Sequence, residues 1–163
     1  MDEPVIVWYL EMTSPGELQA AREPGADVEI ARVQPPSPEL SRRLYEQVGG
    51  PYAWTDRLGW GEREWAAHLG RDGVKTLVAW VGGEPAGYSE LVTADGDVEL
   101  TSFGLREAFI GRGLGGALLH AAVRRAWEQA PGRVWLHTCS LDSPVARPNY
   151  EKRGFRLYDT QTV

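Results

Sequence analysis

The sequence predicts a single domain of the mixed α/β (α+β) class, with a mostly antiparallel central sheet flanked by helices. Its 163 residues are enough for one hydrophobic core and too few for two comfortable domains. No linker, internal repeat or low-complexity tract divides residues 1–163. Segments typical of strands and helices follow one another as a strand meander, a helix, a strand, a helix and a strand, which is the order of a mixed fold.

The first part of the chain contains two predicted strands and one well-marked helix. Residues 5–12 are rich in strand formers, and residues 28–33 alternate between apolar and polar side chains. The connection between them holds two prolines and two glycines and is predicted to be irregular. Ser37 is typical of a helix N-cap and Pro38 of the first helical position. The helix that begins there has apolar residues spaced four apart, namely Leu40, Leu44 and Val48.

Turn signals organise the rest of the chain. Gly82-Gly83 favours the type I′ turn of a β-hairpin, and Asp95-Gly96 is a second turn signal of this kind. Leu114, Leu118 and related residues form an apolar stripe on a long helix, which Pro131-Gly132 ends. The predicted elements are a loop (49–61), a helix (62–69), three meander strands (76–81, 85–93 and 98–105), a helix (113–129), a strand (134–139), a helix (145–153) and a strand (155–158).

Composition excludes several function classes. The chain has 17 basic and 23 acidic residues and a net charge of −6, whereas a nucleic-acid partner normally requires a basic face. One cysteine, Cys139, provides no disulfide or cysteine metal site within the chain, and we expect no metal. The N-terminal residues lack the features of a signal peptide, and no apolar run is long enough to span a bilayer. We therefore expect a soluble cytoplasmic protein with no membrane partner.

A glycine cluster opens the predicted long helix. Gly111, Gly113, Gly115 and Gly116 bring main-chain N–H groups close to any ligand, and the helix N-terminus adds unpaired donors and a partial positive charge. This combination predicts a phosphate site, although glycines also serve tight turns and close helix packing. A dinucleotide site would need the cluster directly after the first strand of a βαβ unit, whereas here it follows an antiparallel meander. No Lys-Ser or Lys-Thr pair follows, as an ATPase phosphate loop would require.

Two motifs together resemble the GNAT superfamily of N-acetyltransferases. One is Ile110-Gly-Arg-Gly-Leu-Gly115 after a long strand, and the other is Tyr150-Glu-Lys-Arg-Gly-Phe155 after a further helix and strand. The family's acetyl-coenzyme A motif is Arg/Gln-x-x-Gly-x-Gly/Ala, so Gly113 and Gly115 match it and Ile110 departs from it. The resemblance covers about residues 76–158, and the first 70 residues resemble the family loosely.

The resemblance implies a GNAT-type fold whose central sheet is splayed in the middle. It also implies acetyl transfer from acetyl-CoA to a primary amine in a ternary complex without a metal, and it allows a homodimer. Residues 76–158 would bind acetyl-CoA and residues 1–75 would supply acceptor-side elements. Asn149 would replace the family's asparagine, because Ser143 stands at that position. The implied cofactor-binding residues are Phe103, Leu105, Gly111, Arg112, Gly113, Leu114, Gly115, Gly116 and Asn149.

Two residues match the catalytic tasks. Glu99 would accept the proton that the amine must lose, and by period-two counting it shares a strand face with Thr101, Phe103 and Leu105. Glu90 and His137 are weaker candidates for this base, and an exposed structural role for Glu99 stays open. Tyr150 matches the family's acid, whose phenol protonates the thiolate of coenzyme A; packing of the last helix is the alternative.

Aromatic side chains are concentrated before residue 66 and are candidates for acceptor binding. Tyr52, Trp54 and Trp60 would form a wall for an aliphatic or cationic acceptor, or they would cover the sheet as core residues. The acceptor stays open among a small-molecule amine (polyamine, amino acid or antibiotic), a peptide N-terminus and a protein lysine. A non-catalytic acyl-CoA sensor on the same fold and a nicotinamide-binding protein are the alternative functions.

Overall fold

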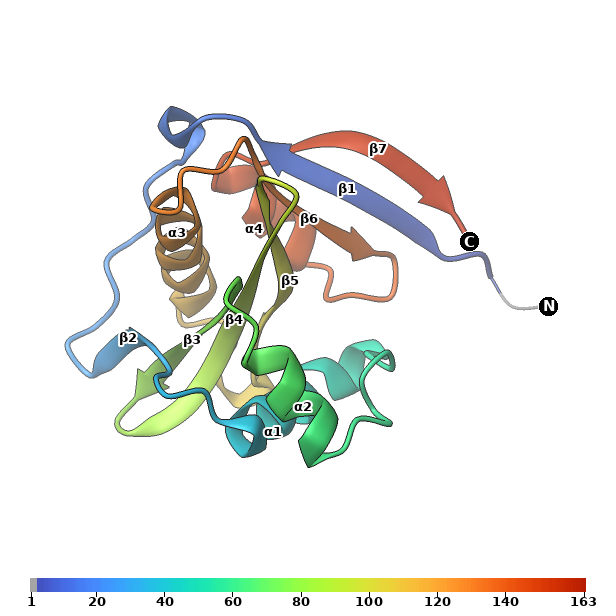
Figure 1. Cartoon of the computed structure of the whole chain (residues 1–163). Coiled ribbons are helices and arrows are strands. Elements are labelled where there is room, and N and C mark those ends of the chain that lie inside the picture. Colours follow the sequence, from blue (N-terminus) through green and yellow to red (C-terminus); the bar gives the residue numbers. More distant parts are fainter. Residues whose placement is uncertain (1–2) are drawn as a thin grey trace.

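Seven strands form one sheet in the order β2-β3-β4-β5-β6-β1-β7, in a computed structural model that describes residues 3–163 (Figure 1). The strands are β1 (Ile6–Met12), β2 (Val28–Arg32), β3 (Val74–Val81), β4 (Glu84–Ala94), β5 (Asp97–Leu105), β6 (Val134–Cys139) and β7 (Arg156–Thr162). The helices are α1 (Pro38–Gly49), α2 (Glu62–Leu69), α3 (Leu114–Trp127) and α4 (Ala146–Lys152). The predicted mixed α/β class with a mostly antiparallel sheet is confirmed.

The predicted turns and the first helix cap have the expected local geometry. Gly82 and Gly83 both have positive φ, at 56° and 87°, as a type I′ turn requires. Asp95 and Gly96 do the same, at 55° and 82°. The Ser37 hydroxyl accepts a hydrogen bond from the main-chain N–H of Leu40 at 3.2 Å and caps α1. Local chemistry therefore fixes the meander β3-β4-β5 and the start of α1.

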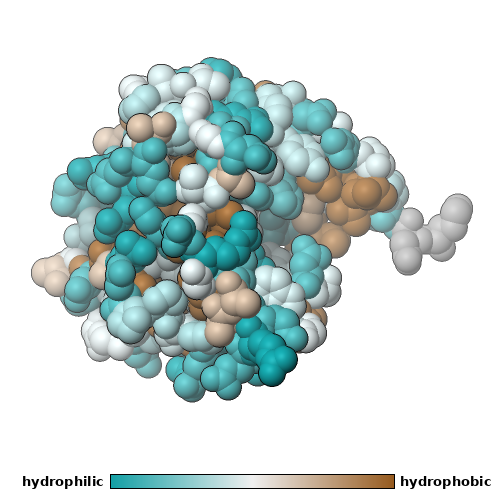
Figure 2. All heavy atoms as spheres, viewed as in Figure 1, coloured by the Kyte–Doolittle hydropathy of each residue, from teal (hydrophilic) through white to brown (hydrophobic). Residues whose placement is uncertain are grey.

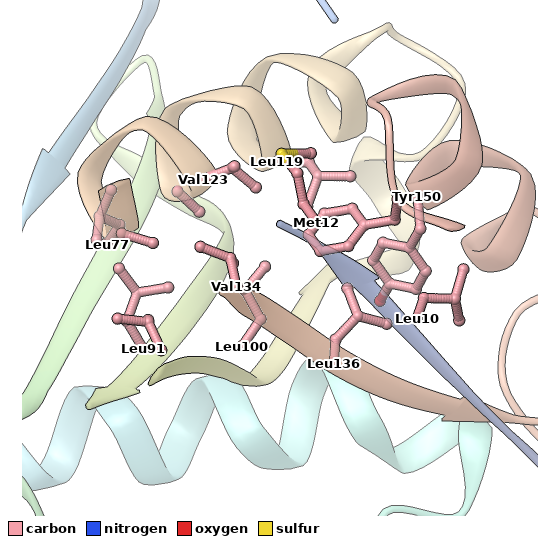
Figure 3. Packing of buried hydrophobic residues seen from close by; sticks show 14 residues of the cluster. Leu10, Met12, Leu77, Leu91, Leu100, Leu119, Val123, Val134, Leu136 and Tyr150 are labelled. Carbon is pink, nitrogen blue, oxygen red and sulfur yellow. The ribbon is translucent and has the colours of Figure 1, made fainter. Parts of the chain in front are cut away.

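The helices cover both faces of the sheet. α3 and α4 lie on one face, where Leu119 and Val123 pack with Leu91 and Leu100 of the sheet and with Tyr150 of α4 (Figure 3). α1 and α2 lie on the opposite face, where two smaller clusters join them to β3, β4 and the loop that precedes α2. None of the helices in residues 3–163 combines the length and apolar character needed for a membrane span.

The sheet parts between β5 and β6. These two strands are parallel and pair at Val98–Val134 and Glu99–Trp135, and no further pairing between them follows toward the end of β5. The later residues of β5 therefore have main-chain groups that no strand on the β6 side satisfies. This opening is the splay that the family resemblance implies.

A β-bulge in β5 corrects the period-two count from Glu99. The register runs Val92–Glu99, Leu91–Leu100 and then Glu90–Ser102, so Thr101 is the extra residue. Directly paired residues share a face. Glu99 accordingly faces α1 and α2, as Val92 does, whereas Phe103 packs with the core beneath α3. Glu99 and Thr101 share a face as predicted, but Phe103 and Leu105 lie on the opposite one.

β1 and β7 extend beyond the body of the molecule as a two-stranded arm (Figure 1). β1 lies between β6 and β7 and is antiparallel to both. β7 is longer than the predicted segment 155–158, and all seven of its residues are exposed. Apolar side chains gather near the free end of this arm (Figure 2).

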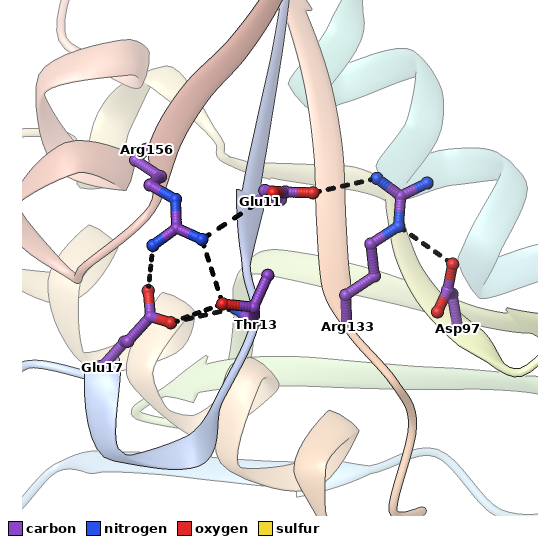
Figure 4. Close-up of polar contacts among 6 residues, drawn as sticks. All are labelled: Glu11, Thr13, Glu17, Asp97, Arg133 and Arg156. Carbon is purple, nitrogen blue, oxygen red and sulfur yellow. Dashed lines mark hydrogen bonds and ion pairs between the residues drawn. The ribbon is translucent and has the colours of Figure 1, made fainter.

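An ion-pair network connects the arm to the rest of the sheet (Figure 4). Arg133 contacts Glu11 at 3.1 Å and Asp97 at 2.9 Å, which links β1 to the strands on both sides of the opening. Arg156 of β7 contacts Glu17 at 3.2 Å. The network reinforces the pairing at the base of the arm, beside the buried side chains of Leu10 and Met12.

Candidate active site

Two pockets meet where β5 and β6 part. The cofactor-side pocket has a volume of about 90 Å³ and extends toward the start of α3. The acceptor-side pocket has a volume of about 390 Å³ and extends toward Glu99 and His137. Five residues line both of them: Tyr52, Trp54, Phe103, Asp142 and Tyr150. A group bound in one pocket therefore lies next to a group bound in the other.

The glycine cluster reaches the cofactor-side pocket at Gly115. Gly111 and Gly113 adopt positive φ, at 89° and 78°, and Gly113 is the N-cap of α3 with no side-chain cap. A Cβ atom at Gly115 would lie 3.4 Å from the Asn149 amide nitrogen, so Gly115 and Asn149 are neighbours in the wall of this pocket. The first turn of α3 thus borders this pocket at Gly115, and its N–H groups have no side-chain cap.

Among the other predicted cofactor residues, Leu105 lines the cofactor-side pocket, whereas Gly116, Arg112 and Leu114 lie outside it. A Cβ atom at Gly116 would meet Ala21 and Arg153 rather than the pocket. The Arg112 guanidinium lies 5.3 Å from the centre of the Phe109 ring, on the exposed side of the cluster. Leu114 is buried against the same ring and supports the helix start from beneath.

Gly104 is explained by a close approach. A Cβ atom there would lie 2.5 Å from a Val48 methyl group of α1, so only glycine allows α1 to pack this closely. A glycine within a strand also occurs at β-bulges, but the bulge of β5 lies at Thr101 and not at Gly104. The main chain of β5 around Phe103 borders both pockets and has no β6 partner.

Tyr150 lies at the junction of the two pockets and is 6% exposed. Its ring packs edge-on against Phe103 and Phe155, with centroids 5.7 Å and 6.2 Å away, and it lies at one end of the main core cluster (Figure 3). Burial raises the pKa of the phenol well above its ordinary value, and the Asp142 carboxylate adds to this effect. The hydroxyl therefore stays protonated over the physiological range and is able to donate.

Glu99 lines the acceptor-side pocket beside His137. The carboxylate Oε2 lies 3.6 Å from the imidazole Nδ1, and the two side chains are 22% and 49% exposed. The interaction with Glu99 raises the pKa of His137, which burial would lower. The pair comes from strands on opposite sides of the opening, and both members remain accessible from the pocket.

Glu90 is held in a very different way and is not a suitable base. Its carboxylate is 1% exposed and accepts two hydrogen bonds from Arg57, at 2.7 and 3.0 Å, with further contacts to His68 and Thr101. Burial would raise its pKa, but the hydrogen bonds from His68 and Arg57 lower it to about 2. Its oxygens are fully engaged, so this weaker candidate from the sequence is set aside.

The predicted aromatic wall is divided between two places. Tyr52 and Trp54 line both pockets. The Trp54 indole rests against Gly49, where a Cβ atom would clash with it, and its Nε1 donates to the Asp142 carboxylate at 3.2 Å. Trp60 lies outside both pockets and packs on Trp65 with ring centroids 5.0 Å apart.

Sequence reasoning missed Asp142 and Arg57 as site residues. Asp142 follows β6 directly, and a carboxylate at a strand end beside the opening was the available signal. Arg57 lies in an irregular loop, and its pairing with Glu90 joins residues 33 positions apart, which no local pattern predicts.

A family model described as Acetyltransferase (GNAT) family matches residues 39–155, which is more than two thirds of the chain. The chain belongs to this family. A comparison with curated protein sequences gives no match.

Solved structures of GNAT proteins have the same fold. A GCN5-related N-acetyltransferase from Sphaerobacter thermophilus is similar with a TM-score of 0.78 and 18% identity, covering 98% of this chain and 51% of that one. The PaiA N-acetyltransferase from Thermoplasma acidophilum, in complex with coenzyme A, is similar with a TM-score of 0.67 and 17% identity, covering 82% and 92%. The ribosomal-protein-S18-alanine N-acetyltransferase from Escherichia coli has a TM-score of 0.62 and 16% identity, covering 79% and 77%. The chain spans about half to two thirds of the length of the first structures it matches.

Proposed function

We propose that this GNAT protein transfers an acetyl group from acetyl-CoA to a primary amine of a small molecule, peptide or protein by direct attack in a ternary complex. The observation that carries the proposal is the meeting of two pockets at Tyr150 and Phe103, where the sheet parts. Direct transfer requires both substrates to be held within reach of each other at once, and adjoining pockets provide this.

The residues around the cofactor-side pocket fit acetyl-CoA. When bound, acetyl-CoA would supply an activated acetyl group, because an amine is able to attack the carbonyl carbon of its thioester. The uncapped N–H groups at the start of α3 would bind its pyrophosphate, and the wall made by Gly115 and Asn149 would hold its pantetheine arm. The unpaired main-chain N–H of Phe103 or Leu105 would bind the thioester carbonyl oxygen as charge develops there.

Glu99 would take the proton that the acceptor amine loses. A lysine-like amine has a pKa of about 10.4, so it is mostly protonated at neutral pH and must be deprotonated before attack. Glu99 lines the acceptor-side pocket, and the carboxylate would accept this proton directly or through a water molecule. His137 would hold the carboxylate in position from the neighbouring strand.

Tyr150 would donate a proton or hydrogen bond to the sulfur that leaves. Its pKa is raised by burial, so the phenol carries its proton at neutral pH. Tyr150 lines both pockets, so its hydroxyl would lie near the carbon–sulfur bond that breaks. The proton would then return to Tyr150 from water after the products leave.

Two measurements test the function. Acetyl-CoA should raise the melting temperature and NAD should not, because only a ligand that binds the folded state stabilises it. An amine panel should then release free thiol from acetyl-CoA. The variant Tyr150→Phe should lower turnover about tenfold or more while acetyl-CoA affinity stays nearly unchanged. Stabilisation by acetyl-CoA without thiol release from any amine would support the non-catalytic acyl-CoA sensor instead.

A further inference from the structure

The acceptor-side pocket contains more negative than positive charge. Glu99, Asp56 and Asp142 all line it. Glu99 raises the pKa of the His137 imidazole most, and Asp142 and Asp56 raise it further, so all three carboxylates act on the same side chain of the pocket. The imidazole itself neutralises at most one of them.

The other cation of this pocket is already neutralised. Arg57 lines the pocket but makes a bidentate pair with Glu90, so its charge is balanced. Asp142 accepts hydrogen bonds from the Trp54 indole and the Thr138 hydroxyl, which are neutral donors and leave its charge intact. In residues 3–163, Asp56 and Asp142 form no ion pair. About two negative charges therefore remain uncompensated.

A second feature shows that the pocket is prepared for a polar ligand. Tyr150 is 6% exposed and lines the pocket, and within the described part of the chain its hydroxyl has no hydrogen-bond partner. The hydroxyl oxygen is not sealed from solvent, so a ligand or water in the pocket is able to form a hydrogen bond with it. Tyr52 and Trp54 add aromatic faces, which attract alkylammonium groups.

We propose, on the basis of the function proposed above, that the acceptor is a small diamine with a short aliphatic spacer. One amine would lie between Glu99 and Tyr150, at the end shared with the cofactor-side pocket, and would lose its proton and react there. The second would stay protonated and face Asp56, which is exposed and lines the acceptor-side pocket alone. Asp142, which lines both pockets, would supply the remaining negative charge between the two amines.

A matched set of four-carbon amines tests this proposal by thiol release from acetyl-CoA. The value of kcat/KM for 1,4-diaminobutane should exceed that for butylamine at least tenfold, and 4-aminobutanoate should fall below butylamine, because the pocket repels a carboxylate. In Asp56→Asn the ratio of diamine to monoamine should fall severalfold toward one. In Asp72→Asn, an exposed residue outside both pockets with the same change in charge, the wild-type ratio should persist.

Three results would overturn the proposal. One is equal kcat/KM for diamines of three to six carbons and their matched monoamines. Another is an Asp56→Asn variant that keeps the full ratio, and the third is preference for the anionic acceptor. In each of these the protein still releases thiol, so the proposed acetyl transfer survives. Absence of thiol release with every amine would refute acetyl transfer itself, and the diamine proposal with it.

Discussion

Two carboxylates on the same face of neighbouring strands, Glu90 and Glu99, have opposite surroundings. Glu90 is sealed beneath the loop before α2, with partners for both oxygens. Glu99 borders an open pocket and has one charged neighbour 3.6 Å away. The comparison shows that the strand face does not decide whether an acidic residue is available for proton transfer; the number of its partners does.

The largest expected effect comes from breaking the buried ion pair between Arg57 and Glu90. Arg57→Met should lower the free energy of unfolding by about 3–5 kcal/mol, because Glu90 would remain buried without its main partner. Denaturant unfolding measures this change. Arg43→Met is the matched control, since Arg43 pairs with Glu39 on the exposed face of α1 and should cost only about 0.5 kcal/mol. Equal losses in the two variants would show that Glu90 is less isolated from water than its contacts indicate.

Low pH should destabilise the fold through protonation of the same buried residue, Glu90. The folded-state pKa of Glu90 is about 2, against an ordinary value of 4.5. The unfolded chain takes up this proton first as the pH falls, so the stabilisation is complete above about pH 4.5 and is lost toward pH 2, by roughly 3 kcal/mol. Urea unfolding followed across this range should show the loss. The free energy of unfolding should depend less steeply on pH in Glu90→Gln. Its pH dependence should be unchanged in Glu46→Gln, because the Glu46 carboxylate pairs with Arg42 on the surface.

The partly buried Glu99, which borders the open pocket, should show the reverse pattern. Glu99→Gln should reduce kcat about 100-fold, because the amide does not accept the amine proton. Its free energy of unfolding should change by less than about 1 kcal/mol, since Glu99 remains accessible to water. Steady-state thiol release and denaturant unfolding on the same sample measure both quantities. Full activity in this variant would transfer the base role to another group.

The smallest effect is the coupling between Glu99 and His137. The carboxylate raises the pKa of His137, so this interaction stabilises the fold below the ordinary pKa of 6.5 and is lost as the pH rises through the raised value. In Glu99→Gln the pKa of His137, followed by NMR titration, should fall. An unchanged pKa would mean that Asp56 and Asp142, rather than Glu99, stabilise the protonated imidazole.

Local signals predicted much of the fold. The Ser37 cap, the glycine turns and the helix over residues 62–69 depend on neighbours within a few positions, and each is found where expected. The position of β1 depends on pairing with β6 and β7, which are more than 120 residues away, and no local pattern encodes it. Long-range pairing is decided by packing of the whole chain, so sequence periodicity alone does not reveal it.

The candidate site was accessible to sequence reasoning where it follows a motif. Gly113, Gly115 and Tyr150 belong to the two motifs that resemble the family; Gly113 caps α3, and Gly115 and Tyr150 line the cofactor-side pocket. The bulge at Thr101 reverses the face of every later residue in β5, and nothing in that strand marks it. Trp54 contacts Asp142 and Trp60 packs on Trp65, and both contacts depend on how the chain folds, so the aromatic content of this segment alone does not separate a pocket residue from one outside the pockets.

The insertion of β1 between β6 and β7 has a consequence for how the protein is made. β1 is synthesised before the other strands of this sheet, and its two partners, β6 and β7, follow the meander and α3. Its two edges stay unpaired while the meander and α3 already have their own neighbours. The far wall of the opening, which β6 forms, is therefore completed only after the meander and α3 have been synthesised, so the two sides of the site do not form together.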